Sequence, residues 1–223
     1  MGIIIILIIV ALVVLWLMRD PAWLREIYKK KSPEQKAVIR YFLREGCLAR
    51  TMKDEEYDAI IERLANSQDF KKNALNKFGL DEDQVQEIPP VHFEGYVFNR
   101  EKAYVKKGKD DLYRSSLYQI TWILFSDTQV YFYQYTFNTD ENTKSETADE
   151  YFYKDITNFS HATTTDEYTY YDKNGKKQIG NVENTKFQIT VPGDKMWAAM
   201  KQCEENENVV KAMKNKLREK KGV

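Results

Sequence analysis

The chain has 223 residues, a length that suits one compact domain with an accessory segment, or two small domains. Lysine and arginine together number 34, as do aspartate and glutamate, so the net charge does not indicate a polyanionic partner such as nucleic acid. A hydrophobic content of 43% is enough to build a core, which excludes a wholly disordered chain.

The first predicted element is a transmembrane helix over residues 2–18. Gly2–Met18 contains no charged or polar side chain, and as a helix it would span roughly 25 Å of a hydrocarbon core that is about 30 Å thick. A cleaved signal peptide would need a basic residue before the apolar run and a small-x-small site after it, and neither is present. So long an apolar run at a terminus is also hard to bury in a soluble core. Because basic residues follow the run, we expect a single-pass protein of the cell membrane whose soluble part is cytoplasmic.

Two basic stretches flank the rest of the chain: a juxtamembrane segment over residues 19–31, and the C-terminal tail. Stop-transfer charge explains the first, and complementation of the helix dipole explains the second. Contact with anionic lipid is the functional alternative for both. The candidate lipid-contacting residues are Arg19, Arg25, Lys29, Lys30, Lys31, Lys214, Lys216, Arg218, Lys220 and Lys221.

Residues 32–90 are predicted to be a helical segment. Ser32-Pro33-Glu34-Gln35 starts the first helix with an N-cap serine, a proline at the first position and a capping-box glutamine. Further helices are expected over Lys53–Ala65 and Ser67–Phe78, with Gly79 ending the latter. A short fourth helix is expected after Asp81, ending before Pro89-Pro90.

Residues 91–223 are predicted to be a β domain with a C-terminal helix, because the sequence becomes rich in Tyr, Phe, Thr and Val between polar turn clusters. Asn174-Gly175 is the strongest hairpin signal, and the acidic stretch Thr139–Glu150 is expected to be an insertion. The last helix is expected to begin at Pro192-Gly193-Asp194 and to bury Met196, Trp197, Met200 and Cys203. The expected strands are His92–Phe98, Lys102–Lys107, Tyr113–Phe125, Gln129–Phe137, Glu150–Asp155, Ile156–Ala162, Glu167–Tyr171 and Thr185–Val191.

Two stretches give this part of the chain a family resemblance. Tyr151–Ile156 (YFYKDI) is a strand that enters a turn, and Phe187–Gly193 (FQITVPG) runs into the last helix. Over roughly residues 91–218 the chain resembles the bacterial pleckstrin-homology-like (PH-like) domains, which implies an antiparallel β-barrel plugged by a C-terminal helix. The expected fold is therefore α+β: a transmembrane helix, a small helical segment, and a PH-like β-barrel closed by the C-terminal helix.

A second resemblance lies in the helical segment. Leu43–Leu64 (LREGCLARTMKDEEYDAIIERL) combines a helix end, a glycine, a short hydrophobic turn and an acidic-aromatic helix start. This stretch resembles the helical hairpin called SHOCT, which occurs alongside PH-like domains and implies a role in assembly. An ordinary helical hairpin is the alternative.

No residues are spaced as a catalytic or metal site requires. His92 and His161 lie far apart without a neighbouring cysteine, and we expect both to be structural. Cys47 and Cys203 are expected to be small buried residues, which favours a reducing compartment. Glycine-rich phosphate loops and catalytic serine or zinc motifs are absent from the sequence. We therefore expect no catalytic residue, no cofactor and no metal.

Aromatic residues are concentrated in the β domain, where 12 of the 15 tyrosines lie between Tyr96 and Tyr171. Tyr131, Tyr133 and Tyr135 should share one face of a strand, opposite to Phe132. Pairing of aromatic side chains across strands explains this pattern. An aromatic platform for a peptide or for bases is the alternative, although no basic residue is interleaved on that strand, which disfavours nucleic acid.

These features favour a membrane-tethered cytoplasmic binding or scaffolding module with an unknown protein or lipid partner and no catalytic activity. Two alternatives stay open. One is a peripheral module that binds anionic lipid through the basic residues named above. The other is an enzyme whose site has no recognisable spacing. The sequence does not indicate the oligomeric state.

Overall fold

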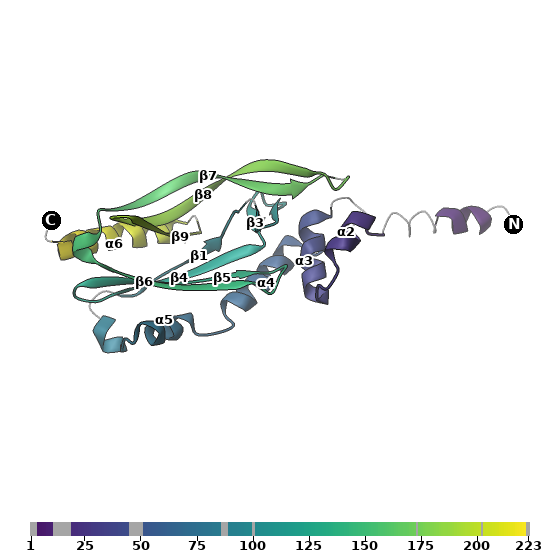
Figure 1. Cartoon of the computed structure of the whole chain (residues 1–223). Helices are drawn as coiled ribbons and strands as arrows, with labels where there is room; N and C mark the ends of the chain where they lie inside the picture. The colour runs from purple at the N-terminus through teal and green to yellow at the C-terminus, as the bar shows by residue number, and fades with distance from the viewer. Residues whose placement is uncertain are drawn as a thin grey trace.

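The computed structural model describes residues 4–10, 19–44, 51–85, 89–99, 101–172, 174–201 and 203–221. Its strands form a four-stranded sheet, a three-stranded sheet and a two-stranded hairpin. Figure 1 shows the long β7–β8 hairpin on one side, the four-stranded sheet next to it, and helix α5 on the far side of that sheet. Helices α2, α3 and α4 gather at one end, and α6 lies at the other.

The prediction of a transmembrane helix over residues 2–18 is wrong as far as the described residues show. Within it, only residues 4–10 are described, as a short helix with exposed apolar side chains, and 11–18 lie outside the described residues. Among all the described ranges no helix is long and apolar enough to cross a membrane. The predictions of a single-pass anchor, of a membrane partner and of a cell-membrane localisation are therefore wrong for the described residues.

The predicted helices of the segment 32–90 are confirmed. α3 (Pro33–Leu43) begins with the capping box of Ser32 and Gln35, and α4 (Asp54–Ala65) follows after a gap in the described residues. α5 (Phe70–Phe78) ends at Gly79, whose φ of 65° is the left-handed conformation that favours glycine. A 3₁₀ turn, η1 (Glu82–Val85), corresponds to the short fourth helix. The sequence did not predict α2 (Ala22–Ile27) in the basic segment.

The four-stranded sheet is antiparallel, in the order β1-β4-β5-β6. Its two long central strands have one face towards the helices, carrying Ile120 and Tyr133, and another towards the three-stranded sheet, carrying Ile123 and Phe132. We call these the helix-facing face and the inner face. The strands are β1 (Val91–Tyr96), β4 (Leu117–Phe125), β5 (Gln129–Asn138) and β6 (Lys144–Phe152).

β6 contains most of the acidic stretch that was expected to be an insertion. It pairs with β5 along its length, with Lys144 opposite Phe137 and Phe152 opposite Gln129. Most of its residues are exposed. An edge strand with charged side chains resists pairing with other chains, so this polar sequence is compatible with a strand at the sheet edge.

The three-stranded sheet consists of β7 (Asn158–Tyr171), β8 (Lys177–Val191) and β9 (Asp194–Ala199). The β7–β8 hairpin turns at Asn174-Gly175, as predicted, with Gly175 at a φ of 78°. The helix predicted from Pro192 is wrong over its first part, because Asp194–Ala199 pairs with β8. Gly193 adopts a φ of 83° and reverses the chain there. The C-terminal helix α6 begins at Glu204 and ends at Lys221.

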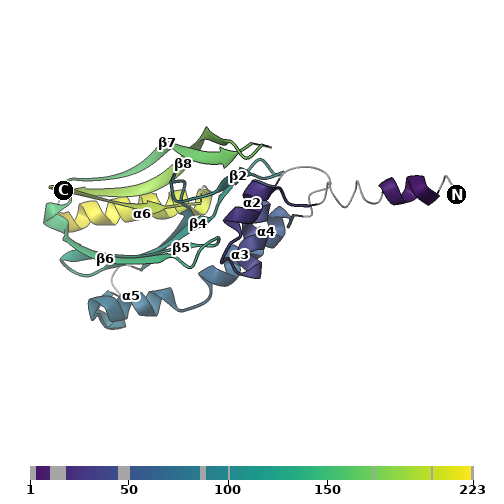
Figure 2. The ribbon, with the colours of Figure 1, turned by 45° about the vertical axis from the view of Figure 1, so that its right-hand side comes forward.

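The predicted closed barrel is also wrong, since none of the sheets formed by the described strands is closed. β7 does not return to β1 but forms its own long hairpin with β8. β1 is left at the sheet edge, where one backbone hydrogen bond, from Lys201 N to Glu94 O at 3.0 Å, joins the two sheets. Figure 2 shows α6 lying between the β7–β8 hairpin and the four-stranded sheet. Its Val210, Met213 and Leu217 complete the core between the sheets.

Candidate functional site

A cavity of about 890 Å³ forms a groove at the outer edge of β1. One wall is α4, the opposite wall is β8 over residues 182–185, and Met200, Lys201 and Cys203 lie between them. The turn of the hairpin formed by β2 (Val105–Lys107) and β3 (Tyr113–Ser115) also contributes to its lining. We call this cavity the acidic groove.

An uncovered strand edge forms one wall of the acidic groove. β8 pairs with β7 along Lys177–Val191, but β9 covers only Lys186–Val191 on the other side. After Ala199 the chain leaves β8, and Lys201 bonds to β1 instead. In the described part of the chain, no strand pairs with this side of β8 over residues 177–185. A strand edge presents alternating N–H and C=O groups to any strand placed beside it.

A buried arginine holds the α4 wall against the β2–β3 hairpin. Arg114 is 4% exposed, and its guanidinium donates to Asp58 at 2.7 and 2.8 Å and to Asp110 at 2.8 and 2.9 Å. The hydroxyl of Tyr96 also donates to Asp58, at 3.0 Å. The hydrogen bond from Arg114 lowers the pKa of Asp110 to about 2. Bidentate pairing of this kind fixes geometry as well as charge, so this wall is rigid.

A second group of charges lies where β1 meets the chain after β9. The Lys201 ammonium pairs with the Glu94 carboxylate, and His92 Nε2 is 3.9 Å from the same carboxylate. The His92 ring stacks on Trp122, and burial lowers the pKa of His92, which keeps the imidazole neutral near pH 7. The Tyr118 hydroxyl is buried here and has no hydrogen-bond partner among the described residues. Burial raises its pKa, and the nearby Glu94 raises it further.

The charge of the acidic groove is predominantly negative. Its cationic groups, Arg114 and Lys201, are both held in ion pairs. Glu62 on α4 and Glu183 on β8 are exposed and have no ion pair among the residues described. Two free carboxylates on opposite walls would attract a cationic ligand between them. The carboxylates in the lining are Asp58, Glu62, Glu94, Asp111 and Glu183.

The basic residues predicted to contact lipid lie at two opposite ends of the molecule. α2 and the residues around it are at one end, and the C-terminal part of α6 is at the other (Figure 1). Several are held in ion pairs: Lys29 with Glu26, Lys31 with Glu141, and Lys220 with Asp127. Arg19, Arg25, Lys30 and Arg218 are exposed, Lys214 is half-buried, and the side chains of Lys216 and Lys221 lie outside the described residues. Lipid contact at either end stays a prediction.

The structure shows where both histidines and one of the two cysteines lie. His161 is exposed on β7, whereas His92 lies in the acidic groove. Cys203 was expected to be buried but is an exposed free thiol just before α6. Cys47 lies outside the described residues. Among the described residues, no three or more histidine, cysteine, aspartate or glutamate side chains are grouped so that they could hold a metal ion.

The structural explanation of the aromatic residues is confirmed. Tyr131 and Tyr133 are buried on the helix-facing face, with Tyr135 packed beside them, whereas Phe132 belongs to the core on the inner face. Ring contacts join this strand to α5, between Phe70 and Tyr135 and between Phe78 and Tyr131. These rings therefore pack the helices against the sheet.

Sequence reasoning missed the residues that build the acidic groove. Arg114 lies in a stretch predicted only to be the start of a strand. One signal was present: an arginine in a predicted strand, four residues after an aspartate, suggests a charge that needs a partner if the strand is buried. The contribution of Asp58 and Glu183 could not be found in this way, because they reach the groove from distant elements.

Comparison of the chain with protein-family models, with curated proteins and with solved structures finds no match. The resemblances to PH-like domains and to SHOCT hairpins therefore stay predictions.

Proposed function

We propose that this protein is a binding module that takes up an extended, basic segment of a partner protein in the acidic groove. The partner segment lies beside β8 over residues 177–185 and pairs with its backbone. The observation that carries this proposal is the uncovered edge of β8, which opens into a groove of about 890 Å³ whose lining includes five carboxylates.

Strand addition suits the geometry of this edge. β8 is already held on its other side by β7, so it can act as a template without rearranging. Backbone hydrogen bonds give such complexes affinity, and pockets for alternate side chains give specificity. In the same groove, the Arg114 pairs fix the distance of α4 from the β2–β3 hairpin, which reduces the cost of ordering the site on binding.

The carboxylates of the acidic groove favour a partner segment that carries basic residues. Glu62 on α4 and Glu183 on β8 both line the groove, and side chains of an added strand alternate between its two faces. Lysine or arginine at every second position of the segment would therefore share one face of the added strand and pair with these carboxylates. Such contacts between exposed charges strengthen encounter and specificity more than they strengthen affinity.

The test uses the full chain and a fluorescent heptapeptide, Thr-Lys-Val-Arg-Val-Lys-Thr, with binding measured by fluorescence anisotropy at two salt concentrations. Binding should weaken with salt because the charges are exposed. A matched peptide with glutamate in place of each basic residue should bind at least about tenfold more weakly. N-methylation of the peptide backbone at alternate residues should abolish binding in one register and leave it unchanged in the other, since an added strand uses every second N–H for each neighbour.

Two variants locate the binding. Glu183→Lys should weaken binding of the basic peptide, and Glu150→Lys, on exposed β6 outside the groove, should not. Amide hydrogen exchange should slow in residues 181–185 when peptide is present. Equal binding of acidic and basic peptides, or unchanged exchange in β8, would contradict the proposal.

A further inference from the structure

The uncovered edge of β8 has a regular arrangement of backbone groups. Among the described strands, none pairs with residues 177–185 on the side away from β7. Lys176 O accepts from Asp172 N at 3.0 Å across the hairpin turn. Because the register with β7 is unbroken, the even-numbered residues of β8 form hydrogen bonds with β7. The odd-numbered residues therefore direct their N–H and C=O groups at the free edge.

The same odd-numbered residues carry exposed side chains. Lys177, Asn181 and Glu183 are exposed, and so is Ile179, at 50%. Val182, whose side chain points to the opposite face, is buried. One face of the edge thus presents two opposite charges and one apolar side chain to any strand that lies beside it.

The sequence of this edge is complementary to itself. Lys177 lies three residues before Gly180, and Glu183 lies three residues after it. In an antiparallel pair of β8 strands with the two Gly180 residues opposite each other, Lys177 of each copy therefore lies opposite Glu183 of the other. Residues opposite each other point to the same face, so two ion pairs form across the edge. Charges on an edge strand usually oppose self-pairing, whereas these two favour it.

The backbone and the length of the edge fit the same register. Ile179 lies opposite Asn181, another odd-numbered residue, so the free N–H and C=O groups of the two copies meet. The two Ile179 side chains become diagonal neighbours on one face and cover each other. Gly175 in the hairpin turn lies opposite Thr185, one residue before β9 begins to pair at Lys186. Each strand therefore ends where the free edge of the other ends.

Other registers lose one of these contacts. The smallest shift that keeps the hydrogen-bonding residues opposite each other is two residues. With Ile179 at the centre, Lys177 lies opposite Asn181 instead of a carboxylate. With Asn181 at the centre, the end of the hairpin turn lies opposite Lys186, where β9 is already paired. Charge and length together select the register centred on Gly180.

We infer that the uncovered edge of β8 pairs with the same edge of a second copy of this chain, antiparallel and centred on Gly180. This pairing rests on the proposed function, because the second copy adds a strand at the same edge and supplies Lys177 as the basic residue opposite Glu183. The dimer and the complex with a partner segment exclude each other, so a partner segment binds the monomer. Few residues pair, which makes the dimer weak and dependent on concentration.

The experiment is sedimentation equilibrium of the full chain over a concentration series up to about 0.5 mM, as a weak dimer requires. The wild type should dimerise. Lys177→Glu places like charges opposite each other at both pairs and should weaken dimerisation at least about tenfold, and Glu183→Lys should do the same. An equimolar mixture of the two variants should form heterodimers about as tightly as the wild type dimerises, because opposite charges then meet at both pairs.

The control is Glu150→Lys, which reverses an exposed charge on the edge strand β6 and should dimerise like the wild type. A wild type that stays monomeric, or a mixture that associates no more than each variant alone, would overturn the inference. Recovery in the mixture also shows that both variants fold. Amide exchange of Ile179 and Asn181 should slow as the wild type dimerises.

The basic peptide used to test the proposed function separates the two ideas. Lys177→Glu keeps every carboxylate of the acidic groove, so it should stay monomeric and bind the peptide at least as tightly as the wild type. A chain that passes the mixing test but binds no peptide would support the dimer and contradict the proposed function. A chain that binds the peptide but stays monomeric would support the proposed function and overturn the dimer.

Discussion

The two faces of the four-stranded sheet are closed in different ways. The helix-facing face is covered by aromatic and aliphatic side chains from α3, α4 and α5, which join it in one continuous core. The inner face has an apolar half, with Phe125 and Phe132, that is covered by α6 and the three-stranded sheet. Its other half carries amides and hydroxyls, such as Gln119 and Thr136, and lines a cavity of about 620 Å³.

The difference between the two faces explains why a cavity remains at the polar half of the inner face. Apolar side chains on the helix-facing face can be buried against any apolar neighbour, so the local helices close it. Amide side chains require specific partners: Gln134 donates to Trp197 O at 2.6 Å, and Gln119 accepts from Ala199 N at 2.8 Å. These bonds hold β9 at the polar half without filling it, and the cavity remains beside them.

The largest expected effect concerns the apolar half of the inner face. Phe132→Ala should lower the free energy of unfolding by about 3–5 kcal/mol, because Phe132 is fully buried and truncation leaves a cavity. Chemical denaturation would measure this. Thr136, on the same strand and face, lines the cavity of the polar half, so Thr136→Ala should cost less than about 1 kcal/mol. Similar losses in the two variants would show that the polar half is packed as tightly as the apolar half.

The next effect concerns the hydroxyls of the helix-facing face. Tyr57 is fully buried, and its hydroxyl donates to Ser115 O at 2.7 Å. Tyr57→Phe leaves that carbonyl unsatisfied and should cost about 1–3 kcal/mol in thermal or chemical unfolding. Tyr131→Phe removes a bond to the half-buried Gln129 side chain and should cost less. Equal costs for both variants would indicate that water reaches Ser115.

A smaller, pH-dependent effect is expected from Arg114 in the wall of the acidic groove. Because Arg114 lowers the pKa of Asp110 from 3.8 to about 2, this pair stabilises the fold above about pH 4, and the stabilisation is lost as the pH falls towards 2. In Arg114→Met, the free energy of unfolding should therefore vary less between pH 4 and pH 2. Lys107→Met removes the exposed pair with Asp111 and a cation–π contact with Tyr113, but it leaves the Arg114–Asp110 pair in place, so it should keep the wild-type profile. An unchanged profile in Arg114→Met would contradict this assignment.

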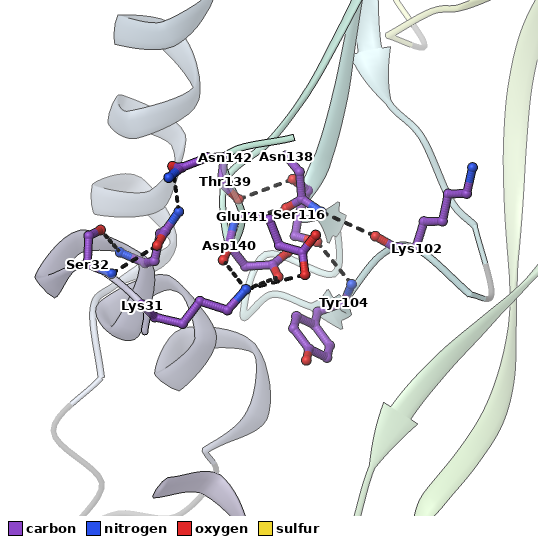
Figure 3. Close-up of polar contacts among 11 residues, drawn as sticks. Lys31, Ser32, Lys102, Tyr104, Ser116, Asn138, Thr139, Asp140, Glu141 and Asn142 are labelled. Atoms are coloured by element: carbon purple, nitrogen blue, oxygen red, sulfur yellow. Dashed lines mark hydrogen bonds and ion pairs between the residues drawn. The ribbon is translucent and has the colours of Figure 1, made fainter. Parts of the chain in front are cut away.

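The smallest effect concerns Asp140 (Figure 3), whose pKa is shifted in the direction opposite to that of Asp110. The pKa of Asp140 is raised by burial, so the folded state binds this proton more strongly than the unfolded state does. The resulting stabilisation is present at acid pH and is lost as the pH rises through the folded-state pKa. Asp140→Asn should therefore be slightly more stable than the wild type at pH 7, and the difference should disappear below pH 3.8. Lower stability of the variant at pH 7 would show that Lys31 favours the ionised form more than burial and Glu141 oppose it.

Local signals predicted much of the fold. The Ser32 capping box, Gly79 and Asn174-Gly175 each placed a boundary that the structure confirms, because each depends on a few neighbouring residues. Periodicity failed where two patterns coincide. Met196 and Met200 are spaced as in a helix, but they also alternate with Trp197 as in a strand, and a short apolar run does not distinguish the two.

Contacts between distant segments were less predictable than the elements that carry them. The acidic groove combines α4, the β1 edge and β8, and its residues are distant in the sequence. Asp140 lay in a stretch interpreted as an acidic insertion, and its neighbours Lys31 and Ser116 come from other segments. No local pattern records such contacts. The basic residues that did stand out in the sequence lie at the two ends of the molecule and do not meet.

The sequence by itself determined where α3 begins, where α4 runs, where α5 ends and which side chains of β5 share a face, because caps, glycines and two-residue alternation act over short distances. Only the tertiary structure decided that Asp194–Ala199 is a strand, that the sheets stay open, and that β8 extends beyond β9. Strand pairing is a contact between distant residues, and the partner available in space decides it. The acidic groove arises from that pairing, at the point where β9 leaves β8.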